Sequence, residues 1–149
     1  MALTARVLRE FVGEQDEISV LLADSDIYYA GGIVCNSSGK GAFISAVAEN
    51  QAALGILTGK YDDGDSVDAK TIGASNTVRA IIKRGKVWLP HASAAQTDVG
   101  GLFTPDSDNS MADVPTTANK RYIGYMALDY KTNALLFDLR NPMVADNET

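Results

Sequence analysis

Several residue types are scarce in this sequence, and each shortage excludes a class of protein. Cys35 is the only cysteine, so no disulfide can form within the chain. His91 is the only histidine, and one histidine with one cysteine does not supply the usual ligand set of a zinc site. No apolar run approaches the roughly 18 residues of a membrane-spanning helix. A basic and apolar leader with a cleavage site is also missing, so we expect a protein that is made in the cytoplasm and not secreted.

Positive charge is also scarce. The chain has 13 Lys and Arg against 19 Asp and Glu, which gives a formal net charge of -6. Phosphate binding needs a concentrated positive surface. We therefore expect neither nucleic acid nor a membrane among the partners of this protein.

The abundant features are apolar residues and glycine. Hydrophobic residues make up 46% of the 149 residues, enough for one domain with a core, and 13 glycines suit a fold with many tight turns. Short β-prone runs separated by turn residues predict a small all-β domain, a sandwich or barrel with short helical turns. The expected strands are residues 18–22, 27–29, 41–47, 54–58, 66–70, 78–82, 86–89, 122–128 and 134–139.

Two of these strand pairs are expected to be hairpins. Arg84 and Gly85 would form the turn of the first, and residues 131–133 the turn of the second. Residues 91–115, rich in Ala, Ser, Asp and Gly, resist a strand prediction and favour a long loop with a short helix at 93–97. A loop this long in a compact domain often has a function or contacts another subunit.

Residues 1–16 differ from the rest, and we expect them to form an N-terminal arm or a short helix before a single β-rich domain at 17–149. Leu3, Val7 and Phe11 recur every four residues, and Gly13 follows as a stop. This spacing permits a helix, although about ten residues make a marginal helix in water. The segment could equally be an extended arm that becomes ordered only against a partner.

The candidates for chemistry each favour a structural role. Residues 36–41 lack the first glycine and the hydroxyl residue of a phosphate-binding loop, so a β-turn is favoured. An acidic cluster at 62–68 lacks the spacing of a calcium loop and reads as a turn followed by a solvent-facing strand. His91 has no nucleophile motif near it, and Cys35 reads as a buried thiol. We therefore expect no catalytic residue, no cofactor, no metal and no enzymatic activity.

A group of basic residues near an aromatic one marks a candidate interface. Arg79, Lys83, Arg84 and Trp88 lie within ten residues of each other. Basic side chains on a strand edge can simply be solvated and discourage aggregation. They can also form one half of a complementary contact between copies of the protein, with the tryptophan at its centre. Both interpretations remain open at this point.

Five elements follow one another in a characteristic order between residues 55 and 142. A strand and turn ending in Gly-Asp-Ser-Val at 64–67 come first, followed by Arg-Gly-Lys-Val-Trp-Leu-Pro at 84–90. A glycine-led segment at 99–105, Tyr-Ile-Gly-Tyr-Met at 122–126 and the strand at 134–139 come next. This order along the chain resembles that of the bacteriophage capsid decoration proteins, also called cement or head-stabilising proteins.

The resemblance implies a fold, a location and partners. It implies a small β-barrel-like or β-tulip domain that stabilises the expanded head from the outer capsid surface of the virion, as a homotrimer bound to the major capsid protein. By position alone, Leu3, Val7 and Phe11 would contact the capsid, and Arg79, Lys83, Arg84 and Trp88 would lie at the subunit interface. The family has no catalytic residues. The alternative is a phage tail component or another non-enzymatic β-domain that binds a protein.

Overall fold

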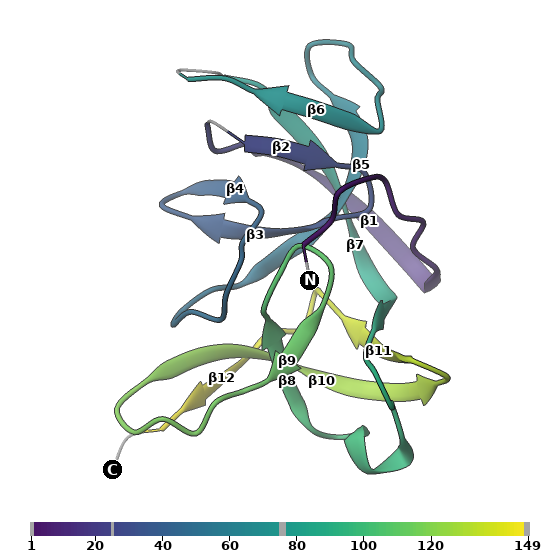
Figure 1. Ribbon diagram of the computed structural model, residues 1–149, viewed down its shortest axis with the longest axis vertical. Helices are drawn as coiled ribbons and strands as arrows, with labels where there is room; N and C mark the ends of the chain where they lie inside the picture. The colour runs from purple at the N-terminus through teal and green to yellow at the C-terminus, as the bar shows by residue number, and fades with distance from the viewer. Residues whose placement is uncertain (1, 25, 75–76, 148–149) are drawn as a thin grey trace.

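The computed structural model describes residues 2–24, 26–74 and 77–147. The described chain is almost entirely β-structure in a curled sheet, which confirms the all-β prediction (Figure 1). Its strands are β1 (Phe11–Leu21), β2 (Asp26–Tyr29), β3 (Ile33–Ser37), β4 (Lys40–Ala42), β5 (Ala53–Tyr61), β6 (Ala69–Ile72), β7 (Arg79–Pro90), β8 (Leu102–Pro105), β9 (Met111–Asp113), β10 (Arg121–Lys131), β11 (Ala134–Asp138) and β12 (Met143–Asp146).

Strand β7 joins the two halves of the main sheet. β1 runs antiparallel along one edge of β7, from Arg79 to Val87. On the other edge β5 pairs with the first half of β7 and β11 with the second half. The sheet then continues from β11 through β10 to β8 and β9, while β2 and β6 form a separate two-stranded ribbon (Figure 1).

The expected hairpin at Arg84 and Gly85 is wrong, because β7 is one continuous strand. Gly85 lies inside it with a φ of 152°, and a Cβ there would come within 2.8 Å of the Glu14 carbonyl oxygen. The register of β1 shifts at the same place, between Val12 and Gln15. The glycine therefore marks a bulge where two backbones approach closely.

The second expected hairpin is confirmed. β10 and β11 are antiparallel, and Lys131 pairs with Ala134 next to the turn. Asn133 has a positive φ of 58°, a conformation that asparagine tolerates better than most residues. β12 then pairs with the first half of β10, from Arg121 to Gly124.

The expected loop at 91–115 is more ordered than predicted. It contains β8, β9 and a single 3₁₀ turn, η1 (Gln96–Asp98), where a short helix at 93–97 was expected. The expected strand at 41–47 ends at Ala42, and the one at 66–70 begins at Ala69. The remaining expected strands lie within β1, β2, β5, β10 and β11, apart from one or two residues at their ends.

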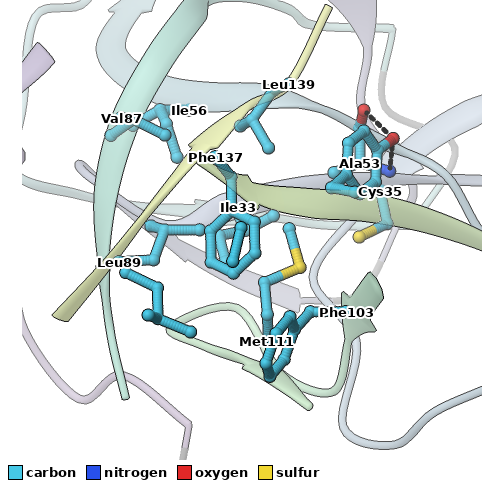
Figure 2. Packing of buried hydrophobic residues seen from close by; sticks show 13 residues of the cluster. Ile33, Cys35, Ala53, Ile56, Val87, Leu89, Phe103, Met111, Phe137 and Leu139 are labelled. Atoms are coloured by element: carbon cyan, nitrogen blue, oxygen red, sulfur yellow. Dashed lines mark hydrogen bonds between the residues drawn. The ribbon is translucent and has the colours of Figure 1, made fainter. Parts of the chain in front are cut away.

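Two clusters of buried residues form the core. The larger one lies under β7, β8, β10 and β11, where Leu89, Phe103, Met111 and Phe137 gather around Ile33 (Figure 2). The smaller one lies beneath the β2–β6 ribbon. Its members are Leu22, Tyr28, Val34, Leu57, Tyr61, Ile72, Ala80 and Ile82. Cys35 is fully buried in the larger cluster.

The N-terminal segment contains no helix in its described residues. Residues 6–10 lack regular secondary structure, and β1 begins at Phe11. The expected boundary at residue 16 therefore falls inside a strand, and the arm ends at Glu10. The short-helix interpretation is wrong because this segment hydrogen-bonds to other parts of the chain and extends into β1.

Candidate interaction surfaces

Leu3, Val7 and Phe11 are all half-buried against their own domain, although a bend at residues 4 and 5 separates Leu3 from the other two. Side chains alternate between two sides of an extended chain, so residues four apart share a side just as they do on a helix. Arg9 lies on the same side as Val7 and Phe11, and Leu8 points away with 79% of its surface exposed. The arm therefore turns the three residues expected to contact a capsid toward the body of the protein.

The arm is fastened to the turn between β2 and β3. The Val7 N–H donates to the Ala30 carbonyl at 3.0 Å, and the Arg9 Nε donates to the Gly31 carbonyl at 2.7 Å. The Arg9 guanidinium also donates to Asn109 Oδ1 at 2.9 Å. Burial lowers the pKa of Arg9 to about 10, although the nearby Asp108 opposes this shift.

Asp108 connects the start of the arm to the core. Its Oδ1 accepts a hydrogen bond from the Leu3 N–H at 2.9 Å, and its carbonyl accepts one from the Ile33 N–H at 2.6 Å. The residue is only 3% exposed, and desolvation raises the pKa of its carboxyl group. The arm and the loop before β9 thus form one hydrogen-bonded unit.

The four residues of the candidate subunit interface lie on β7, and each already has a contact within the chain. The Arg79 side chain donates to Ser19, and Arg84 binds Asp16 through two hydrogen bonds of 2.9 and 3.0 Å. These bonds lower the pKa of Asp16.

The other two residues, Lys83 and Trp88, each take part in a contact between a lysine and an aromatic ring. Lys83 Nζ lies 5.3 Å from the centre of the Phe11 ring. Trp88 is half-buried, with Lys131 Nζ 4.5 Å from its ring centre. A role of these residues between subunits stays a prediction.

An apolar face that the sequence analysis did not single out lies on β10 and β12. Met126, Leu128 and Met143 are between 38% and 44% exposed. Met126, Leu128 and Met143 line a groove of about 500 Å³ together with Pro142, and Lys86 lies at its border. We call Met126, Leu128 and Met143 the β10–β12 face.

A signal for this face is present in the sequence. Residues 122–128 are apolar on both sides of the strand, whereas a sheet with one side in water normally alternates apolar and polar residues. The exposed Met126 and Leu128 belong to this run.

The residues considered for chemistry show no constellation for catalysis. His91 is half-buried with its ring against Phe103, and its Nε2 lies 3.9 Å from Asp98 Oδ2. That carboxylate oxygen accepts a hydrogen bond from the Ala95 N–H, so it caps η1. Burial raises the pKa of Cys35 to about 12, which keeps the thiol protonated and unreactive at neutral pH.

The acidic cluster at 62–68 is partly neutralised by a lysine. Lys70 Nζ lies 2.8 Å from Asp63 and 2.5 Å from Asp65. Across the part of the chain that the structure describes, no group of three or more His, Cys, Asp or Glu could hold a metal ion. The predicted turn lies at residues 62–64.

Comparison with known proteins adds no family. No protein-family model matches the sequence, and no curated protein matches it. No helix in the described residues is long and apolar enough to cross a membrane.

Proposed function

We propose that this protein is a structural component of a bacteriophage virion that binds the outer surface of the head and stabilises the expanded capsid. The major capsid protein and other copies of the chain, in a homotrimer, are its proposed partners, and no catalytic role is proposed. The resemblance between residues 55 and 142 suggests this function, and the all-β fold is compatible with it.

The exposed β10–β12 face carries the proposal. Three large apolar side chains, Met126, Leu128 and Met143, are exposed to water there. Within the described residues β12 pairs only with β10. An apolar surface around a groove is a typical feature of a protein-binding site. A face of this kind gives a decoration protein something to bury against a shell.

The stabilising effect would come from many copies acting together. A standard interface buries about 800 Å² on each partner. A trimer that bridges neighbouring capsomers makes its second and third contacts within one complex, which can raise the overall affinity by about 10²–10⁴. Binding to the expanded shell alone would favour that state by mass action.

Co-sedimentation with phage heads tests the proposal. The purified protein is mixed with expanded heads that lack it and, separately, with unexpanded proheads. We expect saturable binding to expanded heads, with a copy number that matches the three-fold positions of the lattice. Absence of binding to either shell would overturn the proposal in favour of a tail component or another protein-binding module.

Two variants connect binding to the β10–β12 face. Met126→Glu combined with Met143→Glu places two charges on the face and should abolish binding. Val67→Glu is the matched control, because Val67 is 40% exposed and does not line the groove. If the double methionine variant and Val67→Glu both lose binding to expanded heads, or if both keep it, this face is not the contact.

A further inference from the structure

A second groove, distinct from the β10–β12 face, lies between the arm and the sheet. It has a volume of about 290 Å³. Val7 and Leu8 of the arm, Phe11 of β1, and Ile56 and Thr58 of β5 are among the residues that line it. In Figure 1 the arm passes beside the region where β1, β5 and β7 lie together.

Cations concentrate at this groove although the chain as a whole is acidic. Arg6, Arg9, Lys60 and Lys83 line it, and Glu17 is its one acidic lining residue. Asp68 lies next to it and contacts Arg6 at 3.4 Å, with both side chains more than half exposed. The sequence as a whole has a net charge of -6, so the positive charge at this groove is opposite in sign to that of the whole protein.

The lysines at the groove are available for a ligand. Neither Lys60 nor Lys83 forms an ion pair with any carboxylate of the described residues. Lys83 is held at the groove from two sides: its Nζ lies over the Phe11 ring, and its backbone pairs with Glu17 and Ile56 in the neighbouring strands. A fixed cation beside apolar walls binds an anion with less loss of side-chain freedom than a mobile lysine.

We propose that this groove binds an acidic peptide segment of a partner protein, in which carboxylates alternate with aliphatic side chains. The carboxylates would meet Lys60 and Lys83, and the aliphatic side chains would pack against Leu8 and Phe11. Leu8, 79% exposed at the border of the groove, gives such a side chain an apolar contact. A nucleic-acid strand fits less well, because it needs an extended positive surface and the chain as a whole has a net charge of -6.

This inference stands apart from the proposed attachment through the β10–β12 face. The experiment therefore uses the purified full-length chain without phage heads. A synthetic peptide with alternating glutamate and leucine, blocked at both ends, is titrated into isotopically labelled protein and followed by NMR. The matched probe is the same peptide with lysine in place of glutamate.

We expect the glutamate peptide to shift backbone amides around Val7, Leu8, Gly31 and Thr58, and the lysine peptide to leave them unchanged. Salt should weaken binding, because exposed charges more than about 8 Å apart are screened at physiological ionic strength. Lys60→Glu combined with Lys83→Gln should weaken binding about tenfold, since each exposed ion pair contributes a modest share.

Lys86→Glu is the control variant, because Lys86 is exposed on the same strand outside the groove and should bind the peptide normally. If the double variant fails to fold, Lys60→Gln alone should weaken binding by a smaller factor. The proposal is overturned if no amide shifts, if both peptides bind equally, or if the shifts occur around Met126 and Met143 instead.

Discussion

The hydroxyl group of Tyr125 makes two hydrogen bonds with the backbone of Ala53. It accepts one from the Ala53 N–H and donates one to the Ala53 carbonyl oxygen, each at 3.0 Å. Both residues are buried, and the two dashed lines in Figure 2 mark these bonds beside Cys35. β10 is thereby connected to the start of β5, in the other half of the sheet, by one side chain.

Removing this hydroxyl should destabilise the fold. Tyr125→Phe keeps the ring but leaves a buried N–H and a buried carbonyl without their partner, which costs about 1–3 kcal/mol. Urea unfolding followed by circular dichroism measures the loss. Tyr130→Phe is the control, because Tyr130 is 40% exposed on the same strand and should change stability by less than about 0.5 kcal/mol. Equal effects of the two substitutions would contradict this role of Tyr125.

Gly31 allows the arm to approach the turn between β2 and β3. A Cβ at this position would lie 1.9 Å from the Val7 carbonyl oxygen, and the residue has a φ of 91°. Gly31→Ala should therefore push the arm away as well as strain the turn. Hydrogen exchange should become faster at Val7 and Leu8, while the core strands stay protected.

Gly39→Ala separates the displacement of the arm from the backbone strain of an alanine with positive φ. Gly39 has a similar φ of 82°, but a Cβ there would meet nothing within 4 Å. This substitution should cost only the conformational strain, about 1–2 kcal/mol, and leave exchange in the arm unchanged. An arm that stays equally protected in both variants would show that the contact with Gly31 does not hold it.

The fold could be predicted from the sequence where local signals agree. The β10–β11 hairpin was found because a turn sequence separates two apolar runs of strand length. β7 was split in two because Arg84 and Gly85 look like a turn, and only the pairing with β1 shows that the glycine serves a close approach. Local sequence does not distinguish these uses of glycine.

The placement of the arm and of the basic groove depends on contacts between segments that are distant in sequence. A spacing of four residues is common to a helix and to an extended chain, so Leu3, Val7 and Phe11 could not reveal which one forms. The side to which they turn depends on Gly31 and Asp108, which are distant in sequence. The basic groove likewise needs the arm, β5 and β7 together, and only the fold brings these segments into contact.

One buried cysteine thiol and three buried tyrosine hydroxyls should make the stability of the protein decrease at alkaline pH. Desolvation raises the pKa of Cys35 and Tyr61 to about 12, and it raises the pKa of Tyr28 and Tyr125 as well. These groups ionise at lower pH in the unfolded chain, from ordinary values of 9.0 for cysteine and 10.0 for tyrosine. The stability they contribute is fully present below those values and is lost as the pH rises toward the folded pKa.

Urea unfolding between pH 7 and 11 measures this dependence. We expect a constant free energy of unfolding up to about pH 8.5 and a decline above it, with a slope of at most about 1.4 kcal/mol per pH unit for each group. Cys35→Ala should remove the part of the decline that begins first, leaving the part due to the tyrosines. A free energy of unfolding independent of pH up to 11 would contradict the burial of these groups.

Asp108 should reduce stability when it is ionised. Its pKa is raised above the ordinary 3.8, because desolvation outweighs the hydrogen bond from Leu3 and the attraction of Arg9. The sign follows from this direction: the contribution of Asp108 is most favourable below pH 3.8 and decreases as the pH rises and the carboxyl group ionises. Asp108→Asn keeps an oxygen that can accept the Leu3 N–H and removes the charge.

We therefore expect Asp108→Asn to raise the free energy of unfolding at pH 7 and to leave it nearly unchanged at pH 3. Asp113→Asn is the control, because Asp113 is exposed on the neighbouring β9 and should change stability by less than about 0.5 kcal/mol at pH 7. A loss of stability at pH 7 in Asp108→Asn would mean that the attraction between this carboxylate and Arg9 outweighs its desolvation. In that case the charge itself would hold the arm against the loop before β9.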